Sequence, residues 1–168
     1  MRLILSLLLV VFTSITYAQP YSIDKATITF EFPAKEVSGT IEGFKSTSRI
    51  NWEAPEESVF AGSVEAATLD TNNGLRNWSL RGSKYFNVKE YPKLSYQSNR
   101  VVKKGDLWIV EGMLTIKGIR KPFTIEFSQK DNQLVGKGSL YTTDYNIKIK
   151  KKQADNLVNV TFNFPLVR

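Results

Sequence analysis

Apolar and polar residues alternate with a period of two along most of the chain from residue 21 onward, and helical periodicity is almost absent. In the first such run Ile28, Phe30 and Phe32 share one parity, while threonine and glutamate fill the positions between them. A period of two is typical of strands with one buried and one solvated face. The alternation and the turn residues between the runs predict strands at residues 26–32, 37–52, 60–66, 94–102, 108–116, 123–127, 134–140 and 158–164.

These eight runs predict an all-β fold. Several of them are long, whereas strands in globular proteins usually have about five to six residues. The short turn at 117–118 and the turns at 103–106 and 130–132 join consecutive runs directly, as hairpins do. We therefore expect one domain built as an eight-stranded antiparallel up-and-down barrel, with a strand at each end of the chain.

The third and fourth predicted strands are separated by an interruption at residues 71–91. An Asn-Asn-Gly turn precedes Leu75, Trp78 and Leu80 there, and this spacing of three and two fits a short helix. Such a helix must bury its apolar side chains against something. We therefore expect it to lie as a lid across one end of the barrel, with Phe86 adding apolar bulk nearby.

Six of the ten glycines lie in predicted strands at the apolar parity and therefore point inward: Gly39, Gly43, Gly62, Gly112, Gly136 and Gly138. Removing side chains from the inner wall favours a barrel that holds a ligand. Alternatively, the glycines are kinks that let the strands coil. The other inward positions are Phe30, Phe32, Trp52, Phe60, Trp108, Leu114, Phe123, Phe127, Leu140, Phe162 and Phe164. A cavity lined by these side chains would take a hydrocarbon-like ligand.

The composition removes most catalytic chemistry. The 168 residues include no His and no Cys, so there is no imidazole base, thiolate nucleophile, disulfide, or metal site built from these residues. Carboxylate, Lys and Tyr groups remain for acid–base work, and nothing in the sequence assembles a nucleophile, a base and an orienting group. We therefore expect a binding protein without catalytic residues, metal or cofactor.

The N-terminal residues predict export. Residues 1–2 form a short positive start, residues 3–15 are nearly all apolar, and residues 16 and 18 offer small side chains three and one positions before a cleavage site. The apolar run is shorter than the roughly 18 residues that span a membrane as a helix. We interpret residues 1–18 as a secretory signal peptide and residues 19–168 as the mature domain, a soluble protein in the periplasm or outside the cell.

Basic residues exceed acidic ones by 23 to 16, which gives a formal net charge of +7. An exported protein seldom meets nucleic acid, so we expect none as a partner. The densest basic cluster is Lys148, Lys150, Lys151 and Lys152, interleaved with isoleucine. This cluster is either a solvated strand or loop face or a site for anionic lipid headgroups, and the second reading would allow transient contact with a membrane surface.

Two longer motifs connect these features. The first is VEAATLDTNNGLR at 64–76, followed by YFNV at 85–88 and YP at 91–92. The second is GMLTIKGI at 112–119, followed by KPF at 121–123. Together they resemble the YceI-like family of polyisoprenoid-binding proteins, and the resemblance spans essentially the whole mature chain. It implies a lipocalin-like barrel, export to the periplasm, a role in stress response, and a long isoprenoid chain of the polyprenyl or quinone type in the cavity.

The chain departs from the family pattern in the predicted lid. The family usually has an acidic residue and then a His between the Arg and the Leu, whereas this chain has Asn77 and Ser79 between Arg76 and Leu80. An Arg that often precedes a Ser-Asp pair late in the family is also absent before Asp144. These departures leave the predicted barrel unchanged. They imply either a different headgroup on the ligand or binding through the apolar tail alone.

Arg76 is the polar lid residue that we single out. Its guanidinium could donate to a quinone carbonyl or a lipid phosphate, or it forms a structural ion pair with Asp70 or Asp144. The predicted ligand-binding residues of the cavity and lid are Phe30, Phe32, Trp52, Phe60, Arg76, Trp78, Leu80, Phe86, Trp108, Leu114, Phe123, Phe127, Leu140 and Phe162.

The expected function is carriage or storage of an isoprenoid or similar long apolar lipid by a soluble monomer or homodimer. Three alternatives stay open. One is a small eight-stranded outer-membrane barrel, whose apolar face would point outward to lipid. Another is a stress-response barrel without a lipid ligand. The third is an enzyme acting inside the barrel, for instance an isomerase that depends on a Tyr or carboxylate side chain.

Overall fold

The structure is a computed structural model that describes residues 20–167. The predicted signal peptide, residues 1–18, lies outside the described residues. The strands are β1 (Thr27–Phe32), β2 (Val37–Ile41), β3 (Lys45–Ser46), β4 (Ala61–Glu65), β5 (Lys93–Lys104), β6 (Leu107–Ile116), β7 (Ile119–Lys130), β8 (Gln133–Tyr141) and β9 (Leu157–Pro165). The helices are α1 (Gly74–Arg81) and the 3-10 helices η1 (Pro33–Lys35), η2 (Pro55–Glu57), η3 (Ala66–Thr68), η4 (Thr142–Tyr145) and η5 (Ala154–Asn156).

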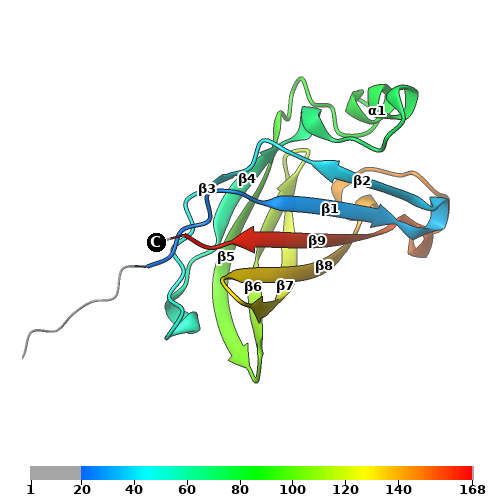
Figure 1. Cartoon of the computed structure of the whole chain (residues 1–168). Helices are drawn as coiled ribbons and strands as arrows, with labels where there is room; N and C mark the ends of the chain where they lie inside the picture. The colour runs from blue at the N-terminus through cyan, green and yellow to red at the C-terminus, as the bar shows by residue number, and fades with distance from the viewer. Residues whose placement is uncertain (1–19, 168) are drawn as a thin grey trace, which may run out of the picture.

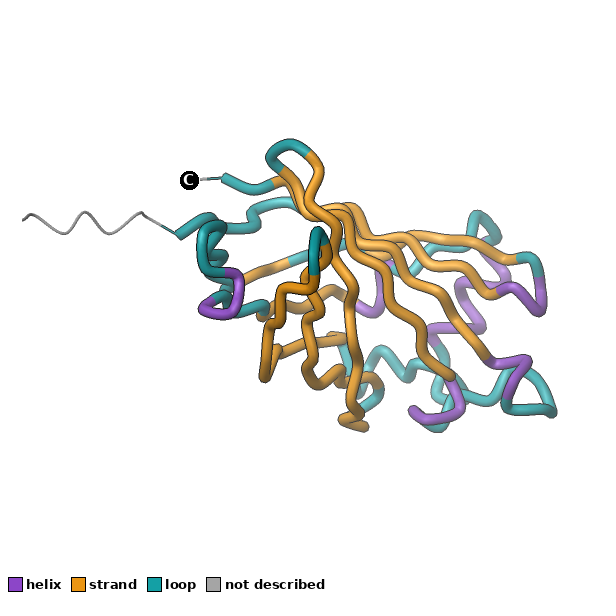
Figure 2. Tube along the Cα trace, turned by 90° about the horizontal axis from the view of Figure 1, so that it is seen from below, coloured by secondary structure: helices purple, strands orange, loops and turns teal. Residues whose placement is uncertain are grey.

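All nine strands of the described residues belong to one sheet in the order β2-β1-β9-β8-β7-β6-β5-β4-β3. Neighbouring strands are consecutive in sequence except β1 and β9, which pair antiparallel from Thr27 opposite Asn163 to Glu31 opposite Asn159. The sheet curls into a half-barrel (Figure 1), and Figure 2 shows the same curvature from below. The predicted all-β, antiparallel up-and-down fold is confirmed.

Between residues 20 and 167 there are nine strands rather than the predicted eight, because the second predicted strand is broken. Gly43 has a φ of +71° and turns the chain between β2 and β3, so it lies outside the strands. Glycine adopts this conformation without a steric penalty. Beyond β3 the predicted run continues only as isolated bridges, Arg49 with Val59 and Ile50 with Tyr21.

β2 is an edge strand of the sheet, and the segment that follows β4 lies against its free edge. Thr40 and Asp70 exchange backbone hydrogen bonds of 2.9 and 3.0 Å. The Thr68 hydroxyl accepts from the backbone N–H of Glu42 at 2.8 Å, and the backbone N–H of Glu65 donates to the Glu42 carbonyl at 3.0 Å. A few hydrogen bonds, rather than the regular pairing of two strands, therefore join β2 to the residues at the end of β4 and directly after it.

Aromatic side chains fill the end of the half-barrel near the chain termini, which we call the closed end. Trp108 and Phe127 are 1% and 0% exposed. Trp52 packs on Trp108 with ring centroids 5.5 Å apart, and Phe60 stacks on Phe127 at 5.1 Å. Phe164 lies against Phe127 at 5.5 Å. Aromatic pairs of this kind add stabilisation beyond the burial of their area, so this end is a packed core.

Aromatic rings pack directly over most of the inward glycines. A Cβ on Gly136 would lie 2.6 Å from Cδ1 of Phe127, its register partner across β7 and β8. A Cβ on Gly138 would lie 2.5 Å from Cζ of Phe123. Two further pairs share this arrangement: Phe30 over Gly39, and Tyr96 over Gly112. The space that these glycines free is therefore taken by rings from the neighbouring strands rather than by the cavity.

The predicted helix is α1, and its orientation differs from the expectation. Asn73 caps it, with Oδ1 accepting from the backbone N–H of Arg76 at 2.9 Å. Asn77 is buried, whereas Leu75 and Trp78 are 79% and 75% exposed. The expectation that the helix buries both apolar side chains is wrong, because hydrogen bonds of Asn77 to the preceding loop set the inward face. No helix between residues 20 and 167 has the length and apolar character needed to cross a membrane.

Candidate ligand-binding cavity

A cavity of about 600 Å³ lies inside the half-barrel. Apolar side chains from β1, β2 and β4 to β9 form most of its wall, because the apolar parity of each strand points inward. The exposed residues Lys35 of η1 and Leu75 of α1 also line it, so it opens at the end of the sheet away from the chain termini. We call this the open end. The volume lies in the range of about 300–1,000 Å³ that is typical of small-molecule pockets.

Ten of the fourteen predicted ligand-binding residues line this cavity: Phe30, Phe32, Phe60, Arg76, Leu80, Phe86, Leu114, Phe123, Leu140 and Phe162. The structure therefore brings together residues from five strands, the residue directly before β4, the helix and the segment after it. Their role in binding a ligand remains a prediction.

The other four predicted residues do not line the cavity. Trp52, Trp108 and Phe127 have the inward parity but lie at the closed end, where Trp52 packs on Trp108 and Phe127 stacks on Phe60. Parity determines the face of a strand and not the depth along the barrel, so their placement in the cavity wall was wrong. Trp78 is also misplaced, because α1 turns it toward solvent.

Arg76 lies at the cavity mouth and has neither of its expected ionic partners. Its Nε donates to Thr71 Oγ1 at 2.8 Å, and its Nη2 donates to the Thr71 carbonyl at 2.7 Å. Within residues 20–167 the only ion pair joins two exposed residues of β5 and β6, so the pair with Asp70 or Asp144 is not formed. Two hydrogen bonds to one residue fix the guanidinium and keep a positive charge at the mouth.

Asn77 connects this arginine to Asp70. Its Oδ1 accepts from Thr71 Oγ1 at 2.6 Å, and its Nδ2 donates to Asp70 Oδ1 at 2.7 Å. The hydrogen bond from Asn77 is the main reason that the pKa of Asp70 is lowered, and the backbone N–H of Asn72 adds to it. A carboxylate at position 77 could not donate to Asp70. The amide therefore completes a chain of hydrogen bonds that orients Arg76.

Sequence reasoning missed the groups that η4 contributes. Thr142 and Tyr145 line the cavity and are 6% and 1% exposed. Thr142 Oγ1 is buried and has no hydrogen-bond partner within residues 20–167. Burial, with a smaller contribution from the Asp144 charge, raises the pKa of Tyr145 to about 12. A signal was present, because Tyr145, Ile147 and Ile149 alternate with polar residues directly after β8 and all three line the cavity.

The cavity combines an apolar wall with one fixed positive charge and neutral hydroxyl groups. Tyr96 also lines the wall, but its hydroxyl already donates to the carbonyls of Val110 and Phe123 at 3.1 and 3.3 Å. No cluster of acidic residues suited to a metal ion occurs between residues 20 and 167. Chemically, the arrangement can hold an extended apolar molecule and donate hydrogen bonds to one polar end.

The family model described as YceI-like domain matches residues 21–166, nearly the whole described chain. The chain belongs to the YceI-like family. The resemblance carried by the motifs at 64–76 and 112–119 is thereby confirmed.

Relatives of this YceI-like chain cover most of its length. Protein YceI of Salmonella newport is 29% identical over 148 residues, which cover 82% of this chain and 78% of that protein. The crystal structure of BcnA from Burkholderia cenocepacia has a TM-score of 0.75 at 18% identity, covering 88% of this chain and 100% of that one. A polyisoprenoid binding domain from Saccharophagus degradans, implicated in plant cell wall breakdown, has a TM-score of 0.56 at 11% identity, covering 88% and 97%. These structures share the YceI-like fold.

Proposed function

We propose that this chain is an exported binding protein that holds a long-chain isoprenoid or a similar apolar lipid, of the polyprenyl or quinone type, for carriage or storage. The observation that carries the proposal is the cavity of about 600 Å³ with an aromatic and aliphatic wall and polar groups at its open end. The polyisoprenoid binding domain that shares the fold supports the same class of ligand.

Burial of the tail supplies the affinity. Each buried CH₂ contributes about 0.8 kcal/mol, so a five-carbon isoprene unit contributes roughly 4 kcal/mol of transfer free energy. A hydrogen bond contributes about 1 kcal/mol net, and the ordering of ligand and side chains offsets part of the gain. A few buried units therefore outweigh any single polar contact, and cavity length and shape select among apolar chains.

The polar end of the ligand meets Arg76 and Thr142. Thr71 engages Nε and Nη2 of Arg76, which leaves Nη1 for a ligand, and the Thr142 hydroxyl has no partner among the described residues. A guanidinium donates well to phosphate or carbonyl oxygen. Ser79 lines the mouth where the family usually has a His. The headgroup is therefore bound by a guanidinium and hydroxyl groups rather than by an imidazole.

The predicted signal peptide at residues 1–18 supports export to the periplasm or the outside of the cell. The exported protein is a monomer or a homodimer. We infer binding rather than catalysis, because the polar groups at the mouth lack the nucleophile and base of an enzyme.

The outer-membrane alternative needs apolar residues on the outward face. Along β7 the opposite holds: Thr124, Glu126 and Ser128 are exposed, and Phe123, Ile125 and Phe127 are buried.

The test is native mass spectrometry of the protein purified from a bacterial periplasm without detergent, followed by organic extraction of bound lipid. Wild type is expected to carry one long-chain isoprenoid per chain. Leu114→Trp enlarges a side chain of the cavity wall and should lower the lipid content. Thr115→Trp is the matched control, because this neighbouring residue of β6 has the outward parity.

Two results would overturn the proposal, provided that circular dichroism shows folded protein. One is a wild-type protein that is empty and takes up neither a polyprenol nor a long-chain quinone on incubation. The other is an equal lipid content in wild type, Leu114→Trp and Thr115→Trp, which would place the lipid outside the cavity.

A further inference from the structure

Two large apolar side chains are exposed next to each other on α1. Leu75 and Trp78 are 79% and 75% exposed, the highest values among large hydrophobic residues between 20 and 167. They are three residues apart and therefore lie on one face of the helix. Asn77 binds the helix to the preceding loop, so this face is held outward. Exposed apolar groups that cluster in this way mark a surface that meets an apolar partner.

A lysine-rich loop is held in one conformation by a single buried amide. Lys150, Lys151 and Lys152 are consecutive in the segment between η4 and η5. Asn156 is 0% exposed, and its Oδ1 accepts from the backbone N–H groups of Ile149 and Lys150, both at 2.9 Å. Its Nδ2 donates to the carbonyls of Lys150 and Lys152 at 3.1 and 2.6 Å. These hydrogen bonds hold adjacent positive charges together despite their repulsion.

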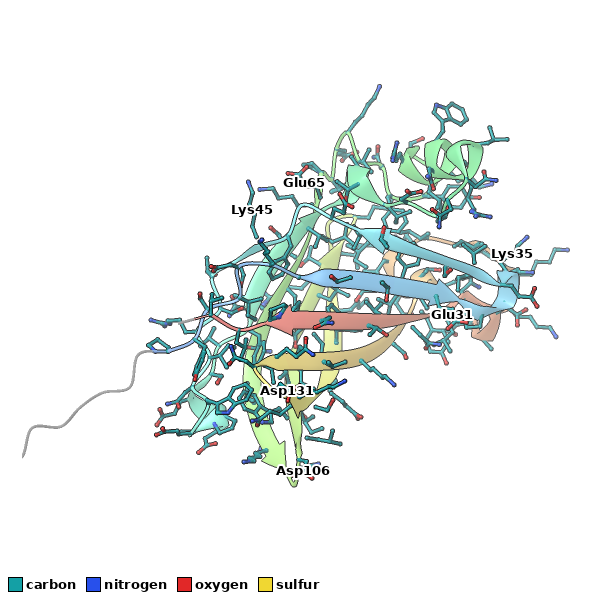
Figure 3. The ribbon with its side chains drawn as sticks, in the orientation of Figure 1. Glu31, Lys35, Lys45, Glu65, Asp106 and Asp131 are labelled. Atoms are coloured by element: carbon teal, nitrogen blue, oxygen red, sulfur yellow. The ribbon has the colours of Figure 1, made fainter. Side chains whose placement is uncertain are left out.

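The helix face and the lysine loop border the same opening. Leu75, Ile149 and Lys35 all line the cavity. Lys35 lies at the open end, away from Asp106 at the tip of the β5–β6 hairpin (Figure 3). The surrounding charge is positive. Residues 142–156 carry four lysines against two aspartates, and residues 70–84 carry two arginines and one lysine against one aspartate.

We propose that the open end docks on the surface of an anionic lipid bilayer, with Leu75 and Trp78 among the headgroups and the lysine loop against the lipid phosphates. Tryptophan favours the membrane–water interface, and lysines near an anionic surface add attraction. This orientation sets the cavity mouth against the bilayer, so a lipid chain can pass between them without crossing water. Only that exchange rests on the proposed function; the docking does not depend on the cavity's ligand.

The test is cosedimentation of the mature protein with vesicles of phosphatidylcholine that contain phosphatidylglycerol, compared with vesicles of phosphatidylcholine alone. Trp78 is the exposed one of the three tryptophans, so fluorescence emission should shift to shorter wavelength on binding. Trp78→Ser should weaken binding about tenfold. Lys151→Gln combined with Lys152→Gln should weaken it roughly 30-fold. None of these residues lines the cavity, so both variants should keep their bound lipid.

The matched controls lie near the closed end. Lys103→Gln combined with Lys104→Gln removes the same charge from β5, and Leu107→Ser removes an exposed apolar side chain from β6. Because both sites are far from the docked surface, binding should change less than about twofold. Equal binding to neutral vesicles, equal loss with the two lysine pairs, or no binding would each overturn the docking.

Native mass spectrometry of the same proteins separates the two proposals. Variants that keep their lipid but lose vesicle binding support the docking. A wild type that binds anionic vesicles but never carries an isoprenoid supports the docking and removes the proposed function. A wild type that carries the lipid but does not bind the vesicles supports the proposed function and removes the docking.

Discussion

Substitution of Gly136 by alanine tests whether the inward glycines seat aromatic rings. The added Cβ would lie 2.6 Å from Cδ1 of Phe127 and 2.9 Å from Cγ2 of Ile125, whereas carbon atoms pack best at about 3.5–4.0 Å. Phe127 is 0% exposed and stacks on Phe60, so its ring has little room to retreat. Overpacking of a core costs about 1–3 kcal/mol, and we expect the free energy of unfolding to fall by about 2 kcal/mol.

Thermal unfolding followed by circular dichroism measures this loss. In a domain of this size, about 2 kcal/mol lowers the Tm by roughly 4–8 °C. Gly74→Ala is the control, because no atom of the described residues lies within 4 Å of a Cβ at that position, and alanine there should leave stability unchanged or raise it slightly. Phe127→Leu makes room for the new methyl group. Gly136→Ala should therefore cost less in that background, with a coupling of about 1 kcal/mol.

The reasoning would be refuted by a Gly136→Ala protein whose Tm lies within about 1 °C of wild type. It would also be refuted by an equal penalty in the wild-type and Phe127→Leu backgrounds. Lipid content gives an independent readout, because neither Gly136 nor Phe127 lines the cavity. The folded variant should keep its lipid; a fall in lipid content would mean that this glycine shapes the cavity.

Three further predictions concern polar groups. The hydrogen bond from Asn77 lowers the pKa of Asp70, so it stabilises the fold above the ordinary carboxyl pKa, and this stabilisation is lost as pH falls through the lowered value. Urea unfolding should show a smaller loss of stability at acid pH for Asn77→Ala than for wild type; parallel pH profiles would contradict this. Asn156→Ala removes four hydrogen bonds of a buried amide and should lower the free energy of unfolding in denaturant titration by about 2–4 kcal/mol, and a loss below about 1 kcal/mol would show that water replaces them. The pKa of Tyr145 is raised to about 12, so its contribution to stability is complete below the ordinary tyrosine pKa of about 10 and is lost as pH rises toward 12. Tyr145→Phe should lose less stability than wild type in alkaline solution, and identical alkaline profiles would exclude this contribution.

The alternation of residue types predicts which side chains face inward, because every second residue of a strand lies on the same face. It does not predict their depth. Trp108 and Leu114 have the same parity on β6, yet Trp108 lies in the closed end and Leu114 lines the cavity. Depth depends on the stagger between strands, which is set by pairings far apart in sequence, such as that of β1 with β9. The ring that each glycine seats depends on the same register.

The orientation of α1 could not be predicted from apolar spacing. Burial of apolar residues orients most helices and predicts that Leu75 and Trp78 face the barrel. A helix of eight residues has few side chains to bury, and in α1 the hydrogen bonds of Asn77 with Asp70 and Thr71 determine the inward face. The short helix therefore follows its polar contacts, and the apolar pair is left for another partner.

Because β1 pairs with β9, the order of strands in the sheet does not depend on which loop holds the chain termini. Ser22 and Val167 exchange backbone hydrogen bonds of 2.8 and 3.1 Å, so the ends of the described chain are adjacent. The edges of the sheet, β2 and β3, are consecutive strands joined by a turn at the exposed Gly43. A circularly permuted chain that begins after Gly43, with a linker joining residues 22 and 167, would pass through the sheet from β3 to β2 with every strand keeping its neighbours. The strand order is therefore cyclic once the two described ends are joined. Exposed turns are the places where new termini or inserted domains would leave the cavity intact.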